Sequence, residues 1–225
     1  MHVFPTYSFN FSDVSTDVER RVTSGGTSLS GQVDVISTDG GGRVFAEFSE
    51  PYLDDERLAL AWRANTDYLS DGLRPVIVPL CDLRHQFGQD IRVPSSLPWW
   101  TEEESIPSNT GAALASDTAH RATTLAISIS YLPKPIEAGM WFSIDHATMR
   151  HRAYRVAEVI SQTHSDATIK ISHPLREAAV ADLAVDFIDP RCVMRLDGSM
   201  RSPTSFGFTS APAIRFVEDF RGTYE

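Results

Sequence analysis

The sequence predicts a mainly β protein with two β units and one helix, in which the second unit is a small β-barrel inserted into the first. Short runs of alternating apolar and polar residues recur at intervals of roughly ten positions, which is typical of antiparallel barrels and sandwiches. Only residues 54–70 show apolar residues at helical spacing. The expected boundaries are 1–83 and 189–225 for the first unit, 84–121 for an extended proline-containing arm or linker, and 122–188 for the barrel.

The opening fifty residues look β-rich. Phe9 and Phe11 alternate with polar neighbours, and strand-length runs follow each of two glycine clusters, at 25–26 and 40–42. The clusters favour hairpin turns, because glycine adopts positive φ at little cost. They do not fit a phosphate-binding loop, which ends in Lys-Ser/Thr and opens a helix.

Residues 54–70 form the one predicted helix. Its apolar stripe falls at steps of three and four and consists of Leu58, Ala61, Trp62, Asn65 and Leu69. Acidic residues at 54–56 suit the helix N-terminus, and Gly72 suits a stop after the last turn. We therefore interpret Trp62 as a core anchor.

The run 74–80 predicts a strand after the helix. Pro75 and Pro79 indicate an edge position, because proline cannot donate to a β ladder. The chain has two cysteines, Cys81 and Cys192, which is too few for a disulfide scaffold at 225 residues. Both lie in apolar runs, so buried free thiols are expected.

Residues 84–121 differ in character. Prolines recur, Trp99 and Trp100 stand together beside acidic residues, and no hydrophobic period is visible. A connection of this length without elements is typically functional or a linker. The tryptophan pair is the candidate interface, since aromatic residues are enriched where subunits meet. A sugar-stacking platform is the alternative for the same pair.

The second unit begins with Leu125, Ile127 and Ile129 on one face of a strand. Four more short strands follow before residue 188, and five such strands suit a small closed barrel. Strand-like runs beyond it start at Cys192 and need a partner sheet. Their natural place is the sheet of the first unit, which makes the barrel an insertion.

The charge balance excludes some classes of function. With 30 acidic against 20 basic residues the formal charge is −10, which argues against nucleic-acid binding. Arg150, Arg152 and Arg155 lie close together, with His146 and His151 among them, and we interpret this cluster as a solvated strand face. No apolar run approaches the length of a membrane span, and no signal peptide is recognisable, so synthesis in a reducing cytoplasm is expected.

Candidate chemistry is sparse. The histidines lack the spaced Cys, His or Asp partners that a zinc site needs. Cys81 and His85 could be a thiol and its base, but sequence alone does not bring them together. Gly26–Gly31 lacks the spacing of a serine elbow. The sequence therefore predicts no catalytic residue, no metal and no cofactor, and a protein that is not an enzyme.

The order of several segments resembles minor tail or distal tail proteins of long-tailed bacteriophages. The segments that carry the resemblance are 24–31, 60–63, 76–82, 121–125, 139–144, 154–156, 173–178 and 192–196. The resemblance covers nearly the whole chain, except the arm around Trp99 and Trp100. It implies a tail-tube-like β-sandwich domain with one helix that carries the inserted barrel.

The resemblance also implies a function in the virion tail. It implies a distal tail adaptor that forms a ring with copies of itself, expected to be sixfold, and joins the tail tube protein to the hub or baseplate and tape-measure proteins. Such proteins have no catalytic residues to transfer. Two alternatives remain: a carbohydrate- or receptor-binding β module, which rests on the tryptophan pair, and a cytoplasmic hydrolase, which rests on Cys81 and His85.

Overall fold

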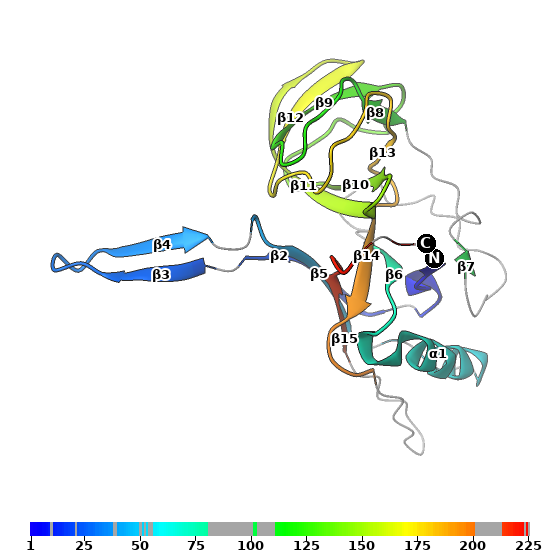
Figure 1. The fold of residues 1–225 in the computed structure, drawn as a ribbon. Helices are drawn as coiled ribbons and strands as arrows, with labels where there is room; N and C mark the ends of the chain where they lie inside the picture. The colour runs from blue at the N-terminus through cyan, green and yellow to red at the C-terminus, as the bar shows by residue number, and fades with distance from the viewer. Residues whose placement is uncertain are drawn as a thin grey trace.

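The computed structural model describes residues 1–9, 11–20, 22–37, 40–49, 51, 53, 56–80, 101–102, 111–200, 213–222 and 224. The protein is mainly β, as the sequence predicts (Figure 1). The described strands form a seven-stranded sheet, a six-stranded barrel-like sheet and a separate two-stranded hairpin.

The seven-stranded sheet contains strands from both ends of the chain. In spatial order they are β2 (Asp13–Glu19), β5 (Arg43–Ser49), β15 (Ile214–Glu218), β14 (Arg191–Leu196), β6 (Val76–Pro79), β1 (His2–Val3) and β7 (Thr101–Glu102). All neighbours pair antiparallel except β1 and β6. The C-terminal runs β14 and β15 thus lie in the middle of the first unit's sheet, where the sequence indicates.

Helix α1 (Glu56–Leu69) packs its predicted stripe into the core of this sheet. Ala61, Trp62, Asn65 and Leu69 are buried, and a short 3-10 helix, η2 (Ser70–Gly72), follows. The predicted acidic start at 54–55 lies outside the described residues, which leaves Glu56 in the first turn. Among the described residues α1 is the one α-helix, and it lacks the length and apolar character to cross a membrane.

Phe9 and Phe11 pack in this core but do not form the strand that their alternation suggests. Phe9 follows a 3-10 helix, η1 (Thr6–Ser8), and Phe11 precedes β2. The ring centroid of Phe9 lies 5.1 Å from that of Trp62, and that of Phe11 lies 5.0 Å from that of Phe48. The spacing of these two aromatic residues therefore reflects their packing in the core and not the alternation of a strand.

Strand β6 is an interior strand, so the edge position predicted from Pro75 and Pro79 is wrong. It pairs with β14 on one side and with β1 on the other. The β1 ladder is short: Val3 pairs with Ile77, and the Phe4 amide donates to the Ile77 carbonyl. The two prolines flank this short ladder, so neither removes a bond that β1 would make.

The six-stranded sheet closes almost completely into a barrel. In spatial order its strands are β13 (Val185–Asp186), β10 (Trp141–His146), β11 (Arg150–Gln162), β12 (Asp166–Ile171), β9 (Thr124–Ile129) and β8 (Ala112–Leu114). A bridge between Ala113 and Ala184 connects the two end strands. Alternate residues such as Leu125 and Ile127 fill the interior.

The barrel begins earlier than the sequence predicts. Strand β8 pairs with β9, and Thr118 bridges to Ala179, so 111–121 belongs to the barrel rather than to the arm. Strand β7 likewise lies within the predicted arm. Both strands, of two and three residues, are too short to show a hydrophobic alternation in the sequence.

The hairpin consists of β3 (Val22–Thr27) and β4 (Val33–Ser37), and it projects away from the rest of the molecule (Figure 1). Glycines 25–26 lie inside β3, where a register shift interrupts the ladder between Ser24 and Thr27, and not in the turn that was predicted there. The turn lies at 28–32 instead, where the Gln32 carbonyl accepts from the Ser28 amide.

Candidate functional site: an exposed hairpin and a buried junction

The hairpin carries aliphatic side chains in solvent. Cross-strand pairing places Val22 opposite Ser37 and Val35 opposite Ser24. Because residues two apart on a strand share a face, Val22, Val33 and Val35 lie on one face of the ribbon, which we call the valine face. Their exposed fractions are 61%, 51% and 63%.

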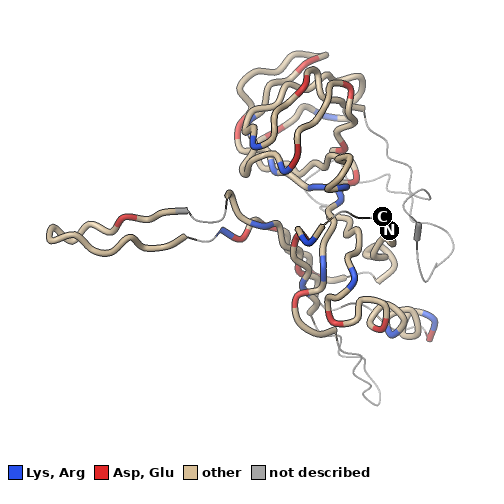
Figure 2. The backbone as a smooth tube through the Cα atoms, in the orientation of Figure 1, with Lys and Arg blue, Asp and Glu red and all other residues tan. Residues whose placement is uncertain are grey.

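The hairpin is almost uncharged. Asp34 is the one charged residue in 22–37, and Figure 2 shows a single acidic segment on the described hairpin. The alternation along β4 places Asp34 on the face opposite the valine face. Leu29 at the tip is fully exposed. Ile36, which pairs with Thr23, is 58% exposed on that opposite face. A ribbon with exposed aliphatic residues on both faces is marginal in water by itself. This arrangement is typical of a segment that packs against another chain.

The second feature is the junction between the barrel and the seven-stranded sheet. Trp141 and Ala153 of the barrel pack in the same apolar cluster as Cys192 and Met194 of β14. The Cys192 thiol is free and fully buried, as the sequence predicts, and burial raises its pKa to about 12. At neutral pH this thiol is therefore protonated and enclosed.

Arg152 crosses this junction and is fully buried. Its Nη1 donates to the Asp219 carbonyl at 2.7 Å and lies 3.6 Å from a carboxylate oxygen of Glu218. The rings of Phe220 and Tyr224 each lie 5.4 Å from its guanidinium carbon. A cation held on strand β11 of the barrel thus binds the strand β15 end of the sheet.

Glu218 on β15 is shared by two arginines. Arg176 donates to both of its carboxylate oxygens, at 3.2 and 2.9 Å, and the Val44 amide donates to it at 3.1 Å. Arg176 also donates to the Gly42 carbonyl at 2.6 Å. The carboxylate therefore connects two barrel residues to two strands of the sheet.

The interpretation of the arginine cluster as a solvated face is wrong for Arg152. Arg150 and Arg155 do lie near the surface, paired with Asp145 at 3.4 Å and with Asp17 at 2.7 Å. The partner that allows Arg152 to be buried, Glu218, is 66 positions away. The available signal was Glu218 itself, an acidic residue at the end of the otherwise largely apolar strand β15.

A polar cluster extends the junction into the barrel. The Tyr154 hydroxyl lies 2.9 Å from His146 Nε2 and accepts from the Arg176 amide at 3.0 Å. The ring of His173 stacks on Tyr154 at 5.2 Å. Burial lowers the pKa of His146 to about 4 and that of His173 to about 3, so both are neutral at pH 7.

This cluster has little capacity for chemistry at neutral pH. Burial raises the pKa of Tyr154 well above its usual value, so its hydroxyl stays protonated. Within the described residues no three His, Cys, Asp or Glu side chains gather as a metal site would need. The groups serve as a hydrogen-bonded packing layer between barrel and sheet.

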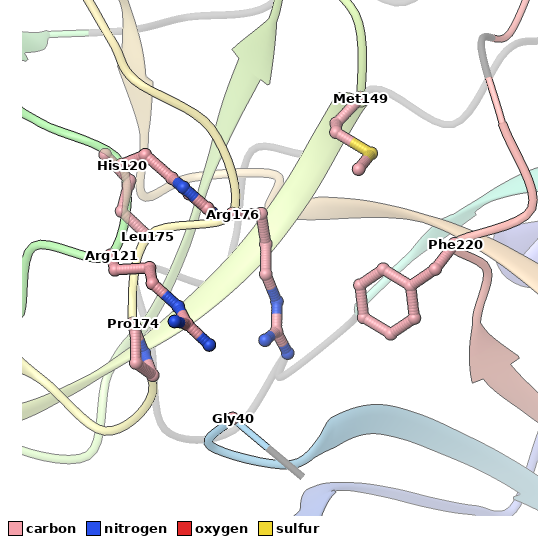
Figure 3. A pocket seen from close by; sticks show the side chains of 8 residues that line it. All are labelled: Gly40, His120, Arg121, Met149, Pro174, Leu175, Arg176 and Phe220. Atoms are coloured by element: carbon pink, nitrogen blue, oxygen red, sulfur yellow. The ribbon is translucent and has the colours of Figure 1, made fainter.

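A pocket of about 310 Å³ opens at the edge of the junction (Figure 3). Figure 3 shows the guanidinium groups of Arg121 and Arg176 directed towards Gly40. Gly41 has φ +115°, and a Cβ there would meet Pro174. The loop formed by glycines 40–42 therefore approaches the barrel closely. The lining residues are Gly40, His120, Arg121, Met149, Pro174, Leu175, Arg176 and Phe220.

The residues that the sequence singled out for function fall elsewhere. Trp99 and Trp100, the candidate interface, lie outside the described residues, as do Cys81 and His85. The sequence did not identify the hairpin as an interface, because its valines are also typical of an ordinary strand within a sheet. The indication that was available is the lack of a neighbouring apolar run in the sequence that could cover these valines.

No protein-family model matches the chain, and no curated protein has a matching sequence.

Proposed function

We propose that this protein is a ring-forming adaptor at the tail tip of a long-tailed bacteriophage, where it joins the tail tube to the hub or baseplate. The observation that carries the proposal is the projecting hairpin with its exposed valine face. The segments that resemble distal tail proteins support it independently. In this proposal the seven-stranded sheet and α1 form the tail-tube-like domain, and the barrel is its insertion.

A second copy of this chain is the partner that the hairpin fits best. Burying a valine contributes about 1.5–3 kcal/mol, so the valine face gains from covering by another apolar surface. A strongly charged partner would gain little from it, because Asp34 is the one charge on the ribbon. Contacts between identical subunits are the apolar kind of interface.

The position of the hairpin favours a ring over a two-fold dimer. It is attached between β2 and β5 at one side of the sheet and extends on the order of 20 Å from it. An arm that reaches out from one side meets a different patch on its neighbour. Such head-to-tail contacts close into rings when the rotation between copies allows it.

The location in the virion has a direct test. Antibodies against this chain, applied to intact phage particles, should label the distal end of the tail in electron micrographs. Label along the whole tube or on the capsid would contradict the proposal, and so would absence of the chain from purified virions. A protein of the capsid used under the same conditions controls for nonspecific labelling.

A further inference from the structure

The pocket at the junction has a basic composition that the adaptor role leaves unexplained. We propose that Arg121 and Arg176 bind an oxyanion there, a phosphate or a carboxylate group. The residues of this site all lie at the barrel–sheet junction within one chain, apart from the hairpin that the ring proposal uses.

Arg121 is held in a conformation that its residue type disfavours. Its φ is +68°, in the left-handed region where glycine or asparagine is usual. The backbone there forms a tight turn: the Ala122 amide donates to Ala119, and the Arg121 amide donates to the Leu175 carbonyl at 3.0 Å. A strained residue with a charged side chain directed into a pocket indicates a functional position.

The two arginines offer unused donors. Within the described part of the chain, the Arg121 side chain makes no hydrogen bond or ion pair, and the Nη1 group of Arg176 makes none either. The other two nitrogens of Arg176 bind Glu218 and Gly42, which fixes the guanidinium in place. An oxyanion between the groups would accept charge-assisted hydrogen bonds from both.

The local charge favours an anion. Arg121, Arg152 and Arg176 supply three positive charges, against which stand Glu218 and Glu177. The Glu177 carboxylate is engaged with the backbone amides of Thr148 and Met149, the latter at 2.8 Å. One positive charge therefore remains uncompensated, although the whole chain carries −10.

The size of the pocket suits a small group. About 310 Å³ is at the lower end of ligand-binding cavities, and Phe220 provides an apolar wall beside the arginines. The ring of Phe220 lies 5.0 Å from the Arg176 guanidinium carbon. The oxyanion can belong to a free small molecule or to an acidic side chain of another protein chain.

Calorimetric titration of the full chain with inorganic phosphate tests the site, with citrate as the carboxylate probe and constant ionic strength. The matched variants are Arg121→Gly and Arg150→Gly, because Arg150 also has positive φ, +55°, but lies outside the pocket lining. Arg121→Gly should weaken binding about tenfold or more, because the charge-assisted bonds are lost. Arg150→Gly should leave the affinity unchanged.

Glycine adopts the positive φ at 121 without strain, so the thermal melting point of this variant should be close to that of the wild type. That measurement separates a loss of affinity from unfolding. Binding of neither probe at millimolar concentration, or equal affinity of Arg121→Gly and the wild type, would overturn the proposal. The effect of phosphate on the assembled protein distinguishes the two sources of the anion. Phosphate should dissociate the assembly if the site holds a neighbour's carboxylate, and should leave the assembly intact if the ligand is a free anion.

Discussion

Charge interactions among Arg152, Arg176 and Glu218 hold the barrel against the sheet. These groups lie in a buried region, where the desolvation of charges is costly. Removing ions from water costs several kcal/mol each, and good geometry repays that cost only when every charge has its partners. Here Glu218 accepts hydrogen bonds from Arg176 and from the Val44 amide, and it forms an ion pair with Arg152 at 3.6 Å. The arrangement therefore specifies how the two units meet more than it stabilises either one.

Removal of Glu218 should be strongly destabilising. Glu218→Ala leaves the buried Arg152 without its carboxylate, and the expected loss in the free energy of unfolding is about 3–5 kcal/mol. Glu158→Ala is the control, because its pair with Lys170 is exposed and worth about 0–1 kcal/mol. Urea denaturation of both variants measures the difference, and equal effects would contradict the account.

Acid should weaken the fold through His146 and His173. Their pKa values are lowered to about 4 and about 3, while the unfolded chain takes up protons near pH 6.5. The unfolded state thus binds more protons, and stability that is complete above pH 6.5 is lost as the pH falls towards 4. Between pH 7.5 and 5 each histidine should account for about 2 kcal/mol.

Denaturation at these two pH values, repeated on His146→Gln and His173→Gln, checks the expectation. Each variant should lose part of the pH dependence, whatever its absolute stability. His164→Gln should keep the wild-type dependence, since His164 is exposed. An unchanged dependence in both buried-site variants would show that other groups cause the acid effect.

The burial of a single residue could be predicted only where the residues beside it in the sequence are apolar as well. Cys192 lies in an apolar run and is buried, as its run indicates. Arg152 lies among other arginines and histidines, so its surroundings in sequence suggested solvent. Its burial depends on Glu218, which a different unit of the chain supplies, and no local pattern contains that information.

Elements with a clear hydrophobic period could be predicted from the sequence, but very short strands and the pairing partners of a strand could not. The stripe of α1 spans several turns, so its period identified both the helix and the buried Trp62. Strands β7 and β8, of two and three residues, are too short for any period. The prediction that β6 is an edge strand was wrong for another reason. A proline lacks the backbone N–H donor, but β1 pairs with β6 only at Val3 and Ile77 and does not use the positions of the two prolines.

The end of the helical region depends on a close contact at Gly72. This residue has φ +90°, and a Cβ there would meet the Leu196 carbonyl oxygen of β14. Gly72→Ala should therefore cost about 2–4 kcal/mol, from backbone strain plus overpacking. Gly139→Ala is the matched control, because φ there is +96° and the space is open.

Gly139→Ala should cost about 1 kcal/mol, from the strain alone. Thermal and urea denaturation of the two variants separate the contributions. If the two substitutions had the same effect, the contact between the helix end and β14 would not be tight, and the position of α1 on the sheet would need another explanation.

At the scale of the whole molecule, the seven-stranded sheet contains strands from both ends of the chain, and the barrel lies between them in sequence. The topology places the barrel on the C-terminal strands and leaves the hairpin projecting to one side, away from both the barrel and the sheet (Figure 1). The hairpin makes no sheet with any other described strand. Its valine face is exposed in the single chain.

A charge on the valine face should prevent assembly without unfolding the protein. Val35→Asp places a carboxylate where the neighbouring copy is expected to pack, and desolvating that charge disfavours the contact. The Val35 side chain is 63% exposed, so the monomer should keep its melting temperature. Thr23→Asp adds the same charge to the opposite face of the same hairpin and should assemble normally.

Light scattering on purified protein and electron microscopy of phage tails read out both variants. Failure of Thr23→Asp alone would place the contact on the other face of the ribbon. Normal assembly of Val35→Asp would remove the hairpin from the interface.

The mass of the assembled species is the most direct test of the ring. Native mass measurement of tail-tip complexes released from virions should show this chain as a closed oligomer, expected to be six copies of the 24.9 kDa chain. The same measurement on Val35→Asp should show single copies. A wild-type chain that is strictly monomeric, both in tail-tip complexes and at high concentration in solution, would contradict the ring and the adaptor function built on it.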